Sequence, residues 1–309
     1  MLRQALLTVS RNDKIKEMSV ALPVTRDVVH RFVAGEGAPD AVAATAELAA
    51  TGRLATIDRL GEDVLELADA EQTRDDYLDL LDGLNANGLT SDAEVSVKLS
   101  AVGQALPGDG EKIALEFAHQ IAAKAHGYGT TVTLDMEDHT TTDSTLGILR
   151  ELRRDFPATG AVIQAYLYRS EADCRDLSGA GSRVRLCKGA YKEPEEVAYQ
   201  SKHEVDLAFV RCMKILMAGD GYPMIASHDP RLVDIAQSLA IHNDRPKGSY
   251  EHQMLYGVRP EEQQRLADSG EKMRVYIPYG RDWYGYMVRR MAEKPANMGL
   301  FLKSLSSKK

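Results

Sequence analysis

Eight short runs of β-type composition alternate with segments of helical length, and this alternation constrains the fold more than any other feature of the chain. Short strands that alternate with helices are typical of parallel βα units, and eight such units close a barrel. The sequence therefore predicts the α/β class, as a (βα)8 TIM-type barrel. The runs lie at residues 56–60, 95–100, 131–138, 161–167, 183–191, 223–229, 251–257 and 273–280.

The segments between these runs predict the outer helices. Apolar residues also recur at helical spacing before the first run, so we expect additional N-terminal helices. The chain has 309 residues and no linker-like stretch, which predicts a single catalytic domain over 1–309. Within it we expect N-terminal helices in 1–52, the barrel in 53–300 and a tail in 301–309. The outer helices are expected at about 71–87, 111–126, 143–154, 171–178, 195–218, 230–242 and 260–268.

Polar and apolar residues alternate within several of the runs. Neighbouring side chains on a strand point to opposite faces. In the second run, Ser96, Lys98 and Ser100 therefore share one face, and the apolar residues between them share the other. Asp135 and Arg185 lie on the polar faces of the third and fifth runs. We expect the polar faces to line the barrel axis and the apolar faces to pack under the helices.

Charged groups inside a barrel are costly unless they pair with one another or bind a ligand. The polar interior therefore has two interpretations. It is either a lattice of buried ion pairs without a ligand or a functional site. Barrel enzymes place their active sites where the strands end, and polar residues stand at these ends in most of the runs. They are Lys98, Asp135, Gln164, Arg185, His228, Gln253 and Tyr276.

The end of the fifth run offers groups that suit a phosphate. Gly189 and Ala190 are small, so the backbone there can approach a ligand closely. Arg185 and Lys188 place positive charge beside them. Alone, this motif is compatible with a phosphate or pyrophosphate site without requiring one. A complete G-x-G-x-x-G fingerprint of a Rossmann domain does not occur in the sequence.

A last helix is expected from near Asp282, just after the eighth run. Spacings of three and four residues place Tyr286, Arg289 or Arg290, and Glu293 on one face of it. Two adjacent arginines offer forked donors that suit a carboxylate or a phosphate. The alternative is a solvated basic face that pairs with the glutamate. Because the helix follows the eighth strand, its start should lie at the barrel mouth, which favours the functional interpretation.

Composition excludes several classes of protein. The net charge of −8 argues against general nucleic-acid binding, which needs clustered lysines and arginines. The 3 cysteines lack metal-type spacing and suit a reducing compartment. No segment resembles a secretory signal or a membrane span, so we expect a cytoplasmic protein. Residues 299–309 mix apolar residues with lysines, and we expect them either to touch the inner face of the membrane or to end as a frayed polar segment.

A carboxylate-rich cluster follows the third run and could hold a metal ion, since oxygen and imidazole ligands suit several divalent metals. Lys98 and Arg185 on neighbouring strands could instead neutralise these charges. We therefore expect no metal. The cluster consists of Asp135, Glu137, Asp138 and His139.

Taken in order, the motifs resemble those of one family. The catalytic barrel of the proline dehydrogenases is similar in its series of segments, which here read VSVKLS, LDMED, IQAYL, RLCKGAYKEP, ASHD, QMLYG, VYIPYG and YMVRRMAEKP. The resemblance covers about residues 53–300. The short chain is similar to the monofunctional bacterial type, and its barrel also resembles the proline dehydrogenase domain of bifunctional proline utilisation A.

The resemblance implies that the protein oxidises L-proline to Δ1-pyrroline-5-carboxylate by hydride transfer to FAD. It also implies a membrane quinone as the next electron acceptor, with peripheral membrane contact, and a separate pyrroline-5-carboxylate dehydrogenase as the enzyme that takes the product. The substrate residues implied by the family pattern are Lys98, Leu255, Tyr276, Tyr286, Arg289 and Arg290, where the arginine pair clamps the proline carboxylate and Asp135 organises the charges. The cofactor residues implied are Asp135, Val162, Gln164, Arg185, Lys188, Gly189, Ala190, Tyr191, Ser227, His228, Gln253 and Glu293.

Two other functions fit the same residues. Lys98 stands where a barrel lyase or aldolase could use it as a Schiff-base amine. A barrel that binds an amino acid without catalysis would also suit the polar interior. A flavin bleached by L-proline, a substrate trapped on the lysine by borohydride, or binding alone would distinguish the three functions.

Overall fold

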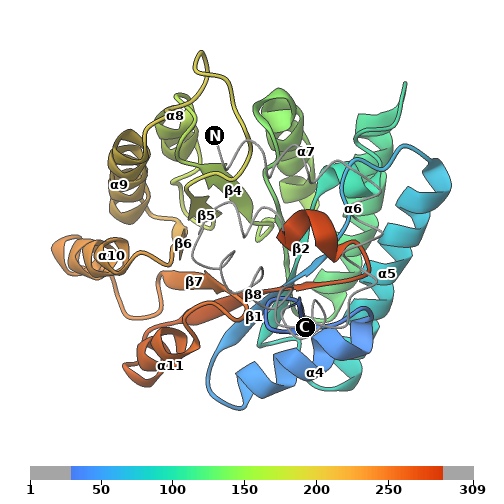
Figure 1. The fold of residues 1–309 in the computed structure, drawn as a ribbon, viewed down its shortest axis with the longest axis horizontal. Coiled ribbons are helices and arrows are strands. Elements are labelled where there is room, and N and C mark those ends of the chain that lie inside the picture. The colour runs from blue at the N-terminus through green and yellow to red at the C-terminus, as the bar shows by residue number, and fades with distance from the viewer. Residues whose placement is uncertain (1–28, 288–309) are drawn as a thin grey trace, which may run out of the picture.

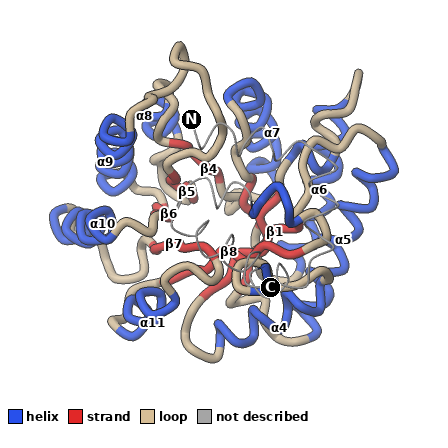
Figure 2. The backbone as a smooth tube through the Cα atoms, viewed as in Figure 1, coloured by secondary structure: helices blue, strands red, loops and turns tan. Residues whose placement is uncertain are grey.

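Eight parallel strands form the inner wall of a barrel, and helices surround them (Figures 1 and 2). The structure, a computed structural model, describes residues 29–287. Every strand begins within two residues of the start of a predicted run, so the predicted (βα)8 barrel is confirmed. The strands are β1 (Leu54–Arg59), β2 (Ala93–Val97), β3 (Val132–Leu134), β4 (Ala161–Gln164), β5 (Arg183–Cys187), β6 (Tyr222–Ala226), β7 (Glu251–Leu255) and β8 (Met273–Tyr279).

An α-helix follows each of the first seven strands on the outside of the barrel. After β8, residues 283–287 are helical, at the place where the last helix is expected. Within residues 29–287, no helix combines the length and the apolar character needed to cross a membrane. The outer helices are α5 (Leu67–Ala86), α6 (Gly110–Gly127), α7 (Thr142–Asp155), α8 (Ser170–Asp176), α9 (Lys202–Ala218), α10 (Pro230–His242) and α11 (Pro260–Asp268).

The helix α4 (Ala38–Ala49) precedes the barrel and falls within the predicted N-terminal helical segment. It packs against β1, β8 and α5, and in Figure 1 it lies along the outside of the barrel beside these elements. A backbone hydrogen bond of 2.9 Å from Ala34 N to Pro278 O fastens the preceding segment to β8. Thus α4 covers the part of the wall where the first and the last strand of the barrel pair with each other. Residues 1–28, where further helices are expected, lie outside the described residues.

The outward faces of the strands form the hydrophobic core with the helices. Ile57, Val95 and Leu186 are fully buried and belong to one core cluster. Leu149 and Leu152 in α7 join this cluster, because a spacing of three places them on the same side of the helix. Burying a side chain of this size contributes about 1.5–3 kcal/mol relative to leaving it in water. The predicted division into an apolar outer face and a polar inner face of the strands is therefore confirmed.

The barrel closes between β3 and β4 through a single-residue bridge. The hydrogen-bonded ladders run in the order β3-β2-β1-β8-β7-β6-β5-β4, and Gly160 completes the circle by bridging Thr133. Leu134 N donates to Gly160 O at 2.9 Å, and Gly160 N donates to Val132 O at 2.8 Å. A Cβ atom on Gly160 would lie only 2.5 Å from Thr133 Oγ1. Close packing of the two strands therefore requires glycine at this position.

Several expected element boundaries are wrong, among them the start of one helix and the end of one strand. The helix expected over 195–218 begins at Lys202, because Ser201 caps it with its hydroxyl and the residues before it form a loop that pairs with the segment after β4. The third strand ends at Leu134 instead of continuing to 138, because the chain then turns into a short 3-10 segment capped by Asp138. Local polar caps therefore set where the following helical segments begin, with Ser201 before α9 and Asp138 before the 3-10 segment.

We predict that Gly160→Ala destabilises the barrel by about 1–3 kcal/mol, the usual cost of forcing extra volume into a packed site. Equilibrium unfolding in urea measures this change. Gly127→Ala is the matched control, because a Cβ atom there would meet nothing within 4 Å. Equal stability of the two variants would contradict the requirement for glycine at the junction of β3 and β4, called the seam below.

Candidate active site

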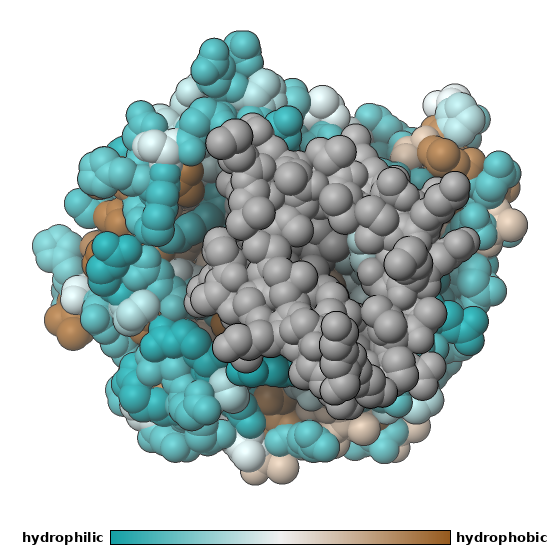
Figure 3. Space-filling view, in the orientation of Figure 1, coloured by the Kyte–Doolittle hydropathy of each residue, from teal (hydrophilic) through white to brown (hydrophobic). Residues whose placement is uncertain are grey.

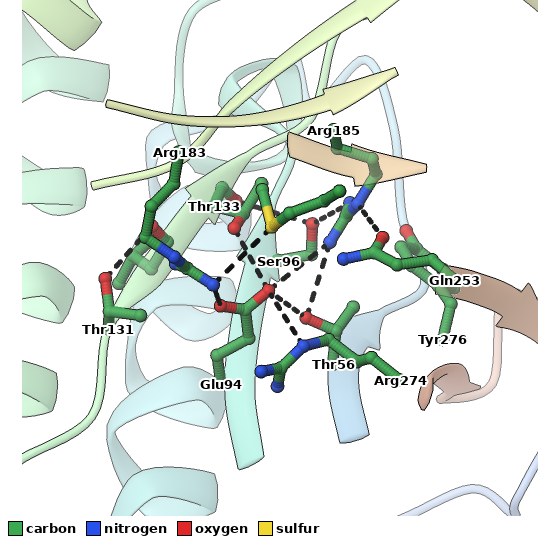
Figure 4. Close-up of polar contacts among 12 residues, drawn as sticks. Thr56, Glu94, Ser96, Thr131, Thr133, Arg183, Arg185, Gln253, Arg274 and Tyr276 are labelled. Carbon is green, nitrogen blue, oxygen red and sulfur yellow. Dashed lines mark hydrogen bonds and ion pairs between the residues drawn. The ribbon is translucent and has the colours of Figure 1, made fainter. Parts of the chain in front are cut away.

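Polar side chains occupy the barrel interior, where branched apolar layers are usual (Figure 4). Two buried carboxylates, here called the lower and the upper hub, each contact several of these side chains. The lower hub is Glu94 on β2. Its Oε2 lies 2.6 Å from Arg183 NH2, and its Oε1 accepts a 2.5 Å hydrogen bond from Thr56 Oγ1. Arg274 lies 4.0 Å from the same carboxylate and pairs with Glu251 at 2.7 Å. Burial alone would raise the pKa of Glu94, but the surrounding arginines hold it below its ordinary value.

The upper hub is Asp135, directly after β3. Its Oδ1 lies 2.7 Å from Arg185 NH1 and accepts a 2.7 Å hydrogen bond from Ser96 Oγ. Its Oδ2 accepts a 2.6 Å hydrogen bond from the hydroxyl of Tyr276. Burial would raise the pKa of Asp135, yet Lys98 and Arg185 lower it below its ordinary value. Asp135 is therefore an ionised carboxylate that links the end of β3 to side chains on β2, β5 and β8.

Lys98 directly follows β2 and lies between two carboxylates. Its Nζ donates to both oxygens of Asp58, at 2.7 and 2.6 Å, and lies 3.6 Å from Asp135 Oδ2. Burial opposes the charge on the ammonium, but Asp58 and Asp135 raise the pKa of Lys98 above its ordinary value. Sequence reasoning missed Asp58, although it shares a face of β1 with Thr56, so the alternation that singled out Lys98 could have found it.

The charges of this interior network balance. Four carboxylates face four cations, and all eight side chains are at most 14 % exposed. A further carboxylate brought in as a ligand would therefore need positive charge in addition to this network. The carboxylates are Asp58, Glu94, Asp135 and Glu251, and the cations are Lys98, Arg183, Arg185 and Arg274.

Arg185 is the most highly connected side chain of the interior. Its guanidinium donates four hydrogen bonds. Its Cζ lies 5.2 Å from the ring centroid of Tyr276. A guanidinium has five N–H groups, so a ligand above Arg185 would meet mainly its positive charge. The acceptors are Gln253 Oε1 at 2.6 Å, Ser96 Oγ at 2.9 Å, Asp135 Oδ1 at 2.7 Å and Thr56 Oγ1 at 3.3 Å.

The ends of β4 and β5 carry several of the predicted cofactor residues. Gln164 Nε2 donates to Glu137 O at 2.6 Å, and Val162 lies beside Arg185 in the register of the two strands. Beyond β5, Gly189 has a φ of 107°, a conformation that favours glycine. The β5–α9 loop, residues 188–201, therefore leaves the strand in a sharp turn.

Lys188, the first residue of this loop, is engaged in ion pairs. Its Nζ lies 2.5 Å from Asp206 Oδ1 and 3.7 Å from Asp229 Oδ2. Ala190 and Tyr191 follow in the loop with half-buried side chains. A phosphate at this turn would therefore share Lys188 with two aspartates, which sequence reasoning did not anticipate.

The ends of β6 and β7 hold one another through polar side chains. His228 Nε2 accepts a 2.9 Å hydrogen bond from Leu255 N, so the neutral ring carries its proton on Nδ1. Ser227 Oγ accepts from Asp229 N at 3.1 Å. Gln253 lies on the inward face of β7, where its Oε1 receives the hydrogen bond of Arg185. These contacts place the predicted residues of β6 and β7 at the same end of the barrel as Lys98 and Asp135.

Tyr286 belongs to a small apolar cluster that includes Leu60, the residue that follows β1. Its side chain is buried, and it occupies the helical segment after β8. Arg289, Arg290 and Glu293 lie outside the described residues. Their assignment to the substrate and cofactor therefore stays a prediction from the sequence.

The carboxylate-rich cluster after β3 does not converge on one point. Asp135 joins the interior network, and the other three members turn to separate partners. Within residues 29–287, no group of three or more metal-binding side chains converges. Glu137 accepts hydrogen bonds from Ser100, Asp138 accepts one from Thr140 N, and His139 Nδ1 donates to Glu193.

Glu137 is an interior carboxyl whose protonation changes near neutral pH. Burial raises its pKa to about 7 from an ordinary 4.5, although Ser100 donates to both of its oxygens. The folded state therefore holds this proton more tightly than the unfolded state does. The resulting stabilisation is present below pH 4.5 and is lost as pH rises through about 7.

We predict that Glu137→Gln removes this pH dependence. Between about pH 5 and 8 the free energy of unfolding of the wild type should fall by about 2–3 kcal/mol relative to the variant. Urea unfolding at both pH values measures the difference. Glu116→Gln, an exposed change on α6, is the control. Parallel pH curves for wild type and Glu137→Gln would contradict the raised pKa.

We also predict that Asp58→Asn destabilises the protein by about 3–5 kcal/mol, because it leaves the buried ammonium of Lys98 under-compensated. Asp58→Asn with Lys98→Met should cost less than the sum of the single changes. The control is Asp82→Asn, which breaks a surface pair with Lys124 of the same 2.6 Å length and should cost about 0–1 kcal/mol. If the costs of Asp58→Asn and Lys98→Met are additive in the double variant, the predicted coupling between Asp58 and Lys98 is refuted.

The protein is a (βα)8 barrel with a charge-balanced interior, and its functional groups lie at the C-terminal ends of the strands. This is the architecture of the barrel enzymes. The comparisons with known proteins identify the family within this class. A family model described as proline dehydrogenase matches residues 41–302. The chain therefore belongs to the proline dehydrogenase family.

Individual relatives agree with this assignment. Proline dehydrogenase 1 of Bacillus subtilis is 38% identical over 308 residues, which cover 100% of both chains. Proline dehydrogenase of Deinococcus radiodurans is 38% identical over 305 residues, or 98% of this chain and 97% of the relative. Among solved structures, proline utilization A of Bdellovibrio bacteriovorus, inactivated by N-propargylglycine, matches with a TM-score of 0.78 and 27% identity over 86% of this chain and 32% of that one.

Proposed function

We propose that the protein catalyses the FAD-dependent oxidation of L-proline to Δ1-pyrroline-5-carboxylate and passes the electrons to a membrane quinone. The match of the proline dehydrogenase family over residues 41–302 is the observation that carries this proposal. The relatives named proline dehydrogenase, which align along nearly their whole length, support the substrate. The geometry of the barrel mouth supports the roles of individual residues.

The donors at the mouth suit a flavin. Arg185 and Lys188 bring positive charge, Gln164 and Gln253 bring amides, and the left-handed turn at Gly189 lets backbone groups approach a pyrophosphate closely. We assign FAD to these residues, together with Ala190, Tyr191, Ser227, His228 and Glu293. When bound, the flavin supplies a two-electron acceptor for a hydride from the substrate carbon.

The residues around Asp135 suit an amino-acid substrate. Lys98 is a buried cation, and Tyr276 offers an aromatic wall beside it, with their polar atoms 3.4 Å apart. The interior charges are already balanced, so we assign the proline carboxylate mainly to Arg289 and Arg290, with Lys98 as a third donor. A positive site of this kind also favours the neutral form of the substrate amine, which is the form that can lose a hydride.

The Schiff-base alternative fits the structure less well. A nucleophilic lysine must be neutral, and enzymes achieve this by lowering its pKa. Asp58 and Asp135 instead raise the pKa of Lys98. A barrel that only binds an amino acid is the remaining alternative, and the flavin experiment below distinguishes it.

The quinone, the membrane and the product are the outer partners in the proposal. We propose that the protein works in the cytoplasm and reaches the quinone through peripheral contact with the inner face of the membrane. Residues 299–309 are the segment we assign to this contact. A separate pyrroline-5-carboxylate dehydrogenase would take the product.

We predict that the purified protein contains FAD and that anaerobic L-proline bleaches the flavin absorbance. Arg290→Ala should weaken proline about ten- to a hundredfold, since it removes a charge-assisted hydrogen bond. Flavin content should stay unchanged. A colourless protein that binds proline would instead support the non-catalytic barrel, and borohydride trapping on Lys98 would support the lyase.

Pyrrolidine tests whether the arginine recognises the carboxylate. It has the ring amine of proline without that group, so Arg290→Ala should barely change its binding. Tetrahydrofuroic acid has the carboxylate and should weaken in parallel with proline. Equal losses for proline and pyrrolidine would mean that Arg290 acts on the fold or the cofactor instead.

A further inference from the structure

The β5–α9 loop carries the residues that we assign to the flavin, yet it contains neither a named strand nor a helix over its 188–201 span. Loops of this length are usually among the most variable and mobile parts of a protein. This loop is instead fastened at its beginning, middle and end. One residue outside the loop, Tyr166, takes part in every one of these attachments.

The backbone of Tyr166 joins the two ends of the loop. Tyr166 N donates to Lys188 O at 3.1 Å, where the loop begins. Tyr166 O accepts a 2.8 Å hydrogen bond from Tyr199 N, where the loop ends. Next to it, Leu167 forms an antiparallel bridge with Ala198. The segment after β4 therefore acts as a short strand that both ends of the loop pair with.

The side chain of Tyr166 fixes the turn and the middle of the loop. Its ring lies against Gly189 so closely that a Cβ atom there would be 2.3 Å from Tyr166 Cε1. Its hydroxyl donates a 3.2 Å hydrogen bond to Glu193 Oε1. Burial and the charge of Glu193 raise the pKa of the phenol above its ordinary value, so it stays protonated as a donor.

Glu193 extends this attachment to a third loop. Its carboxylate is 2 % exposed and accepts a 2.9 Å hydrogen bond from His139 N, and the ring Nδ1 of His139 donates to its other oxygen. Gln200 Nε2 donates to Glu193 O at 3.3 Å, within the β5–α9 loop itself. The carboxylate thus satisfies a buried donor from the segment after β4 and part-buried donors from the loop after β3. Removing it would leave these donors without their acceptor, which is costly in a buried place.

We propose that Tyr166 and Glu193 are positioning residues that hold the β5–α9 loop in its flavin-binding shape before the cofactor arrives. The proposal rests on the flavin-dependent function proposed above. A loop that is already ordered does not have to be ordered by its ligand. The contacts of Tyr166 and Glu193 with the loop, called the clamp from here on, should therefore raise the affinity for the cofactor. Neither residue needs to touch the flavin for this effect.

The test uses the full-length protein stripped of flavin, with the dissociation constant for FAD measured by fluorescence quenching. Glu193→Ala and Tyr166→Phe should each weaken FAD about tenfold, and Glu193→Gln, which keeps an acceptor oxygen, should recover part of the loss. The double variant Tyr166→Phe with Glu193→Ala should be little weaker than Glu193→Ala alone. Amide hydrogen exchange in residues 188–201 of the flavin-free protein should become faster in both single variants.

Two matched controls separate the clamp from a general loss of stability. Glu196→Gln removes an exposed charge from the same loop. Tyr128→Phe removes a hydroxyl that donates to Asp82 at 2.7 Å, on the outer surface between α5 and α6. Both should leave the FAD affinity and the exchange of the loop unchanged.

The possible outcomes distinguish the clamp from the proposed function. If the wild type binds FAD and the clamp variants bind it within about twofold of the wild type, the clamp is refuted and the function stands. The clamp is also refuted if the loop exchanges no faster in the variants, or if thermal stability falls with no change in the FAD affinity of the folded protein. If the wild type binds no FAD, the proposed function and the clamp fail together.

Discussion

The balance of buried charge inside the barrel is the constraint on which the rest of the structure depends. Taking ions out of water costs several kcal/mol each, and only good geometry with opposite charges compensates for it. Glu94 and Asp135 receive this compensation from side chains on several different strands. Each strand must therefore present its polar residue at the correct height, so the ion pairs specify the strand register together with the apolar outer face.

This network also divides the work between the wall and the mouth of the barrel. Arg185 uses most of its donors on the wall, and the ammonium of Lys98 is held by Asp58. The wall therefore supplies a fixed electrostatic setting at the strand ends. The shape of the site comes from the loops above it, where Tyr166 and Glu193 join the segments that follow three strands.

The sequence predicted the parts of this structure that have a regular period. The series of eight strand-like runs between helical segments predicted the barrel, and alternation with a period of two placed Lys98, Asp135 and Arg185 in its interior. Asp58 was not predicted, although the same alternation places it on one face of the first run with Thr56. Tyr166 and Glu193 have no comparable signal, since their partners are set by how three loops fold together. The late start of α9 has the same origin, because tertiary pairing of the preceding loop prevails over local helical pattern.

The seam at Gly160 makes the barrel mechanically uneven. Seven ladders hold neighbouring strands together, whereas β3 and β4 share only the bridge at this glycine. Asp135 follows one side of the seam and Gln164 ends the other, so the seam separates a residue assigned to the substrate charges from one assigned to the flavin. The junction of β3 and β4 is therefore the weakest connection in the closed sheet. Thermal opening of the wall should begin there and widen the site between its two halves while the other ladders stay intact.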